Sequence, residues 1–208
     1  SNVVAGNFIG TDSTGQAAVS NAFAGVALSG AVGNQIGGPA AAWGNTISGN
    51  GQSGVALTEG AFWNVIQANR IGTEASGAKP LGNGYHGVSL AGVSNLLGGA
   101  ATGLGNTISG NRYNGVYLAG PDSCNNLLQA NRIGTDSLGR FALGNRLFGV
   151  LIENAPSNSI GGGVPNAGNL ISGNAGNGVF LVGTNATGNA VQGNWIGTDI
   201  TGSTRLPN

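Results

Sequence analysis

The chain has 208 residues, of which 40% are hydrophobic and 7% are charged, and seven basic residues balance seven acidic ones. The hydrophobic content excludes a disordered chain, and the lack of a basic excess argues against a nucleic-acid partner. The single Cys124 excludes an internal disulfide, and no apolar run reaches the ~18–20 residues of a membrane span, so we expect no membrane insertion.

The first recurring sequence word is GVAL at residues 25–28. Related words follow at 54–57, 87–90, 115–118, 149–152 and 178–181, spaced by 28 to 34 residues. Within each word the valine and the last residue are two positions apart, so both side chains point to one face of an extended strand. These words therefore predict short strands that recur once per structural unit.

A second word, Asn-x-aliphatic, follows each of the first. We expect its asparagines to stack as a ladder of side-chain amides, with ligand binding by exposed amides as the alternative. The predicted ladder is Asn34, Asn64, Asn95, Asn126, Asn158 and Asn189. A second predicted row is Asn50, Asn111 and Asn174, continued by Asn83 and Asn145.

The third word alternates between two forms. N-T/L-ISGN begins at residues 45, 106 and 169, and N-x-IGT-D/E begins at residues 7, 69, 131 and 194. No segment has the apolar period of a helix, so each unit of 28 to 34 residues carries three short strands. Residues 1–208 are thus predicted to form one all-β domain, a parallel β-helix of about six to seven coils in double coils of about 62 residues. Crossovers of this kind are right-handed.

The words N-x-I-x-G-N, G-V-x-L and N-x-I-G-G resemble the right-handed parallel β-helix repeat of the pectin-lyase-like superfamily over essentially the whole chain. That resemblance implies the fold and leaves the function open, because the superfamily includes polysaccharide lyases and hydrolases, phage tailspikes and surface or adhesin-type repeats. We expect the chain to be a fragment of a longer array and to associate end to end through open strand edges.

An acidic residue ends each copy of the IGT-D/E word. These residues are Asp12, Glu74, Asp136 and Asp199. A turn-forming role is favoured, because a carboxylate in such a turn can accept bonds from nearby backbone amides. Calcium binding and catalysis are the alternatives, but neither comes with the further acids that it needs. We expect no cofactor and no metal.

The residue before the isoleucine of the third word should point outward. In alternate coils it is Phe8, Arg70, Arg132 and Trp195, a candidate carbohydrate-contact row, since rings stack on sugars and guanidinium groups donate to hydroxyls. The alternative is that these long side chains only shield the sheet. The even coil lengths lead us to expect no loops that wall a cleft.

Three functions are compatible with these features. The favoured one is a non-catalytic structural or adhesive segment of a secreted or cell-surface protein. The alternative is a carbohydrate-binding or polysaccharide-processing module with a polysaccharide or cell-surface glycan as partner. An ice-binding solenoid is the third, but its threonine array would be interrupted. The paired carboxylates of glycoside hydrolysis are not evident, so we predict no enzymatic activity.

Overall fold

The computed structural model describes residues 1–39 and 41–208. It consists of short strands and, among these residues, one 3-10 helix, η1 (Ala41–Trp43). The strands form three parallel sheets with strand orders that skip two elements at every step. In the described part of the chain, no helix is both long and apolar enough to cross a bilayer.

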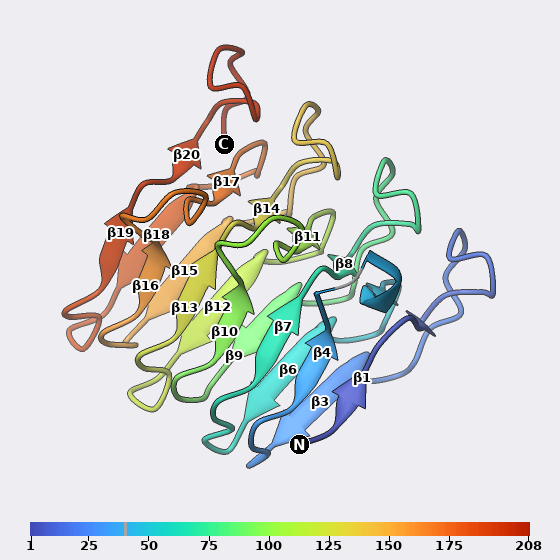
Figure 1. The fold of residues 1–208 in the computed structure, drawn as a ribbon, viewed down its shortest axis with the longest axis horizontal. Coiled ribbons are helices and arrows are strands. Elements are labelled where there is room, and N and C mark those ends of the chain that lie inside the picture. The colour runs from blue at the N-terminus through green and yellow to red at the C-terminus, as the bar shows by residue number, and fades with distance from the viewer. Residues whose placement is uncertain (40) are drawn as a thin grey trace.

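The chain passes through the three sheets in turn, and each sheet holds one strand from every complete coil (Figure 1). Sheet 1 contains β1 (Val3–Val4), β4 (Gln35–Gly37), β7 (Val65–Gln67), β10 (Leu96–Gly98), β13 (Leu127–Gln129), β16 (Ser159–Gly161) and β19 (Ala190–Gln192). Sheet 2 contains β2 (Phe8–Ile9), β5 (Thr46–Ile47), β8 (Arg70–Ile71), β11 (Thr107–Ile108), β14 (Arg132–Ile133), β17 (Leu170–Ile171) and β20 (Trp195–Ile196). Sheet 3 contains β3 (Val26–Ser29), β6 (Val55–Thr58), β9 (Val88–Leu90), β12 (Val116–Ala119), β15 (Val150–Glu153) and β18 (Val179–Val182).

This arrangement confirms the predicted fold, a parallel β-helix of about six turns with three strands per coil. The register places each sequence word on its own copy: Ile36 pairs with Ile66 in sheet 1, and Ile108 pairs with Ile133 in sheet 2. A single strand of two to four residues could not stand alone, but each backbone pairs with equivalent strands in adjacent coils. The repeat in the sequence therefore supplies the pairing partners of the structure.

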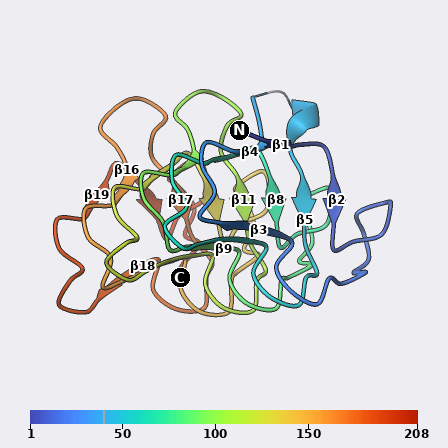
Figure 2. The ribbon, with the colours of Figure 1, turned by 90° about the horizontal axis from the view of Figure 1, so that it is seen from below.

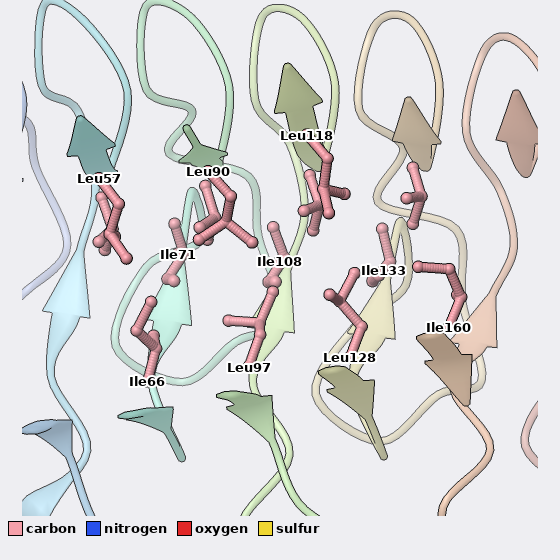
Figure 3. Packing of buried hydrophobic residues seen from close by; sticks show 14 of the residues in the cluster. Leu57, Ile66, Ile71, Leu90, Leu97, Ile108, Leu118, Leu128, Ile133 and Ile160 are labelled. Carbon is pink, nitrogen blue, oxygen red and sulfur yellow. The ribbon is translucent and has the colours of Figure 1, made fainter. Parts of the chain in front are cut away.

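The hydrophobic core is a set of stacks that run along the axis of the helix (Figure 3). Leu97 of sheet 1, Ile108 of sheet 2 and Leu118 of sheet 3 face one another in the interior and are at most 1% exposed. Full burial of such a side chain contributes about 1.5–3 kcal/mol. Because every coil repeats the same inward positions, the core continues without interruption from coil to coil.

The glycine of the GVxL word allows sheet 3 to approach the other sheets closely. A Cβ atom on Gly115 would lie 2.5 Å from Cγ2 of Ile133 and 2.7 Å from the carbonyl oxygen of Gly149. Both distances are too short for any side chain, so only glycine fits before the first inward valine.

Asparagine side chains stabilise all three corners of each coil. Both predicted rows are confirmed as ladders in which Nδ2 of one asparagine donates to Oδ1 of the asparagine in the next coil, at 2.8–3.1 Å where this bond forms. The first ladder begins one coil earlier than predicted, at Asn2, and the second extends from Asn21 to Asn208. A third ladder precedes sheet 2: Asn7, Asn45, Asn69, Asn106, Asn131, Asn169 and Asn194.

Candidate functional site

The outward positions of sheet 2 form one continuous row. This floor row is Phe8, Thr46, Arg70, Thr107, Arg132, Leu170 and Trp195, each paired with the next. The four residues of the candidate carbohydrate-contact row therefore lie in one line. They are not adjacent to one another, because a threonine or leucine of the intervening coil separates each pair.

The floor row is more deeply covered than an open sheet face would be. Thr46, Thr107 and Leu170 are 4%, 6% and 3% exposed, whereas Phe8 and Trp195 are nearly half exposed. The row lies on the side of sheet 2 opposite the inward isoleucines, but in alternate coils its side chains are covered. Loops that leave both edges of sheet 2 account for the difference.

The first wall consists of four hairpins, one after each IGT-D/E word (Figure 1). Each hairpin closes with an antiparallel bridge, such as Thr135 with Ala142. The hairpins also bond to one another, although they leave only alternate coils. The amides of Ala75, Ser137 and Ile200 donate to carbonyl oxygens of the preceding hairpin at 2.8–2.9 Å. These bonds make the hairpins a continuous ridge beside the floor row.

The intervening ISGN words provide the base on which the hairpins rest. Oγ of Ser109 donates to the carbonyl oxygen of Thr135 at 2.7 Å and accepts a bond from the amide of Gly134 at 3.1 Å. Oγ of Ser48 makes the same pair of bonds to the carbonyl oxygen of Thr73 and the amide of Gly72. The serine of one word therefore satisfies the backbone at the base of the next hairpin, which explains why the two words alternate.

The repeated acids lie at the start of these hairpins and accept bonds from hairpin amides. Oδ1 of Asp136 accepts from the amides of Arg140 and Phe141 at 2.7 and 3.0 Å, and its carboxylate is buried. The amide of Gln16 is the largest cause that lowers the pKa of Asp12, and the hydroxyl of Thr201 has that role for Asp199. Glu74 makes equivalent bonds in its own hairpin.

The second wall consists of loops between sheets 1 and 2 in the other coils. The loops after β10 and β16 rise beside η1 on one side of the β-helix (Figure 2). They are tied to the preceding coil by backbone bonds, from the Ala68 amide to the carbonyl oxygen of Leu104 and from the Ala130 amide to that of Ala167. The expectation that no loop would wall a cleft is therefore wrong, because the walls themselves follow the repeat.

Between these walls lies a cleft of about 560 Å³. Arg132, Leu170 and Trp195 of the floor row contribute to its lining, with Thr102 and Asn166 from the loops and Ile200 from a hairpin. Nε of Arg132 is buried and has no hydrogen-bond partner, and the same is true of Nε of Arg70 two coils earlier. A cleft with an unpaired guanidinium group and a half-exposed indole can bind a polar ligand with apolar faces.

A second cluster, on the outward face of sheet 3, was not predicted as a unit. The His86 ring packs against Tyr117 with ring centroids 4.6 Å apart, and the Tyr117 hydroxyl donates to the Glu153 carboxylate at 2.5 Å. Burial lowers the pKa of His86 to about 4, so this ring is neutral near pH 7. Burial, followed by the hydrogen bond and charge of Glu153, raises the pKa of Tyr117 to about 12. Tyr85 and Tyr113 stack beside this cluster.

In the described residues, no group of three or more His, Cys, Asp or Glu side chains is arranged so that it could hold a metal ion. Cys124 is a free, partly buried thiol. It lies two residues before Asn126 of the first asparagine ladder and is not among the residues that line the cleft.

Comparison with known proteins yields one structural neighbour. No protein-family model matches the sequence, and no curated protein matches it. Among solved structures, the chain is similar to a crystal structure of the periplasmic alginate epimerase AlgG, with 17% sequence identity and a TM-score of 0.47. The similarity covers 82% of this chain and 37% of that one, so the chain spans well under half the length of the epimerase.

Proposed function

We propose that this β-helix binds an extended glycan in the groove over sheet 2, as the carbohydrate-binding segment of a secreted or cell-surface protein. The observation that carries the proposal is the cleft that Arg132 and Trp195 line together, with the Nε of Arg132 left without a partner. An indole ring packs on the apolar face of a sugar, and a guanidinium group donates to its hydroxyl or acidic groups. The groove between the two walls follows the β-helix axis, which suits a linear polymer.

Binding without turnover is the better-supported form of this proposal. Glycoside hydrolysis uses two carboxyl groups about 5–9.5 Å apart. The acids next to the groove, Asp136 and Asp199, are engaged with amides of their own hairpins. A structural or adhesive role, as predicted from the sequence, is compatible with glycan binding, since a surface rod can adhere through its groove.

A glycan array tests the proposal directly. We would screen the chain beside Arg132→Ala and Trp195→Ala, with Arg112→Ala and Trp63→Ala as matched controls, because both control side chains are exposed and lie outside the cleft lining. We expect one glycan class to bind the wild type and both controls, and to bind the two groove variants at least about tenfold more weakly. Equal loss in the controls, or no glycan bound by the wild type, would refute the proposal.

A further inference from the structure

The two arginines of the floor row repeat with a period of two coils. Arg70 and Arg132 both pair with Thr107, which lies between them. At a strand spacing of about 4.8 Å, their Cα atoms are about 10 Å apart along sheet 2. Arg132 lines the cleft, and Arg70 continues the same row beyond the residues that line it. That separation is comparable with the length of two sugar rings in an extended polysaccharide.

The chemistry of these positions alternates with the same period. Each arginine has a buried Nε without a hydrogen-bond partner, whereas the intervening Thr107 is neutral and 6% exposed. The hairpins add no net charge to this pattern, because Lys79 and Arg140 share the hairpins after β8 and β14 with Glu74 and Asp136. The positive groups that recur once per double coil are the two arginines of the floor row.

We infer that the groove recognises a linear polysaccharide with one anionic group on every second sugar. This inference depends on the glycan binding proposed above. One guanidinium group binds each carboxylate or sulfate, in a bidentate arrangement that a single point charge could not provide. The uncharged sugar between two anionic ones lies over Thr107, where the groove offers no cation.

Calorimetry with three oligosaccharides of equal length tests this inference. The probes are a hyaluronan oligosaccharide, with a carboxylate on every second sugar, an oligogalacturonate, with one on every sugar, and a neutral chitin oligosaccharide. We expect the wild type to bind the hyaluronan probe at least about tenfold more tightly than the other two. Arg70→Gln and Arg132→Gln should each weaken that binding about tenfold, since a hydrogen bond to a charged group is lost.

A gain-of-charge variant provides the matched reversal. Thr107→Arg places a guanidinium group in the intervening coil, at a position that arginine already occupies in both neighbouring coils. The variant should bind oligogalacturonate more tightly relative to hyaluronan than the wild type does. Circular dichroism reports whether the variant is folded. If the wild type binds oligogalacturonate or chitin as tightly as hyaluronan, the inference is wrong and glycan binding stands. If none of the probes binds and the array is also negative, both fall.

Discussion

Removal of one asparagine from the middle of a ladder should destabilise the β-helix strongly. Oδ1 of Asn106 accepts bonds from N and Nδ2 of Asn69, at 2.9 and 3.0 Å. Its Nδ2 donates to the carbonyl oxygen of Ile66 at 2.8 Å and to Oδ1 of Asn131 at 2.9 Å. The side chain is completely buried, so bulk water does not reach these four groups in the folded protein.

The expected magnitude follows from the groups left without a partner. Each buried polar group that loses its bond costs about 1–3 kcal/mol. The Asn69 amide and the Ile66 carbonyl are main-chain groups that lose a bond, and the truncation leaves a small cavity besides. We therefore expect Asn106→Ala to lower the free energy of unfolding by about 3–5 kcal/mol. The control is Asn177→Ala, whose side chain is exposed and whose effect should stay within about 0.5 kcal/mol.

Urea unfolding and hydrogen exchange together check this prediction. In a solenoid each coil contacts only its neighbours, so faster exchange should be confined to β8, β11 and β14. Asn106→Asp is a second variant, in which Oδ1 still accepts its bonds but the Nδ2 donor is replaced by a buried carboxylate oxygen. Its free energy of unfolding should rise as the pH falls and the carboxyl group becomes protonated. Equal stabilities of Asn106→Ala and Asn177→Ala would refute the energetic role of the ladders.

Three further predictions follow from other parts of the structure. Gly98→Ala should lower the free energy of unfolding in urea by about 2–5 kcal/mol, because its φ is +87° and a Cβ would lie 1.9 Å from the Gln129 carbonyl oxygen. The control is Gly120→Ala, which has a φ of +79° but open space around it and should lower that free energy by only about 1–2 kcal/mol. Asp136→Ala should cost about 1–3 kcal/mol, and Asp136→Asn less, because Oδ1 still accepts the two amides; a stability increase on adding calcium would instead identify a metal role. The pKa of His86 is about 4 when folded and 6.5 ordinarily, so the unfolded chain binds the extra proton and stability is lost as the pH falls from about 6.5 to 4. With the partial exposure of the ring allowed for, the loss should be about 1–2 kcal/mol and absent from His86→Gln, and an unchanged pH profile in that variant would contradict it.

The fold was predictable because its determinants are local words that recur in phase. Valine and leucine two positions apart identify the inward face of sheet 3, and a six-fold recurrence identifies the stacking partner. Two asparagine ladders followed from the same reasoning. The third was missed, although the same reasoning leads to it: both forms of the third word begin with an asparagine, as at Asn69 and Asn106, and both occupy the same strand position of the coil.

The candidate site was predictable only in part. The alignment of Arg132 and Trp195 followed from the repeat, but their cleft did not. The sequence reasoning expects functional loops where the repeat is interrupted. In this structure the wall loops are part of the repeat and alternate between the two edges of sheet 2. The backbone bonds that tie hairpin to hairpin and loop to coil depend on three-dimensional proximity, as in the bond from Ser137 to Gly77, so composition alone could not reveal them.

The fluorescence of Trp195 provides the most direct test of glycan binding in the groove. The chain has three tryptophans, so a variant with Trp43→Phe and Trp63→Phe leaves Trp195 as the single reporter. Titration with the glycan selected on the array should change its emission along a saturable curve with the same Kd as calorimetry, and Arg132→Ala in this background should shift that curve about tenfold to higher concentration. A glycan that binds by calorimetry without any change at Trp195 would place binding elsewhere and contradict the groove as the site.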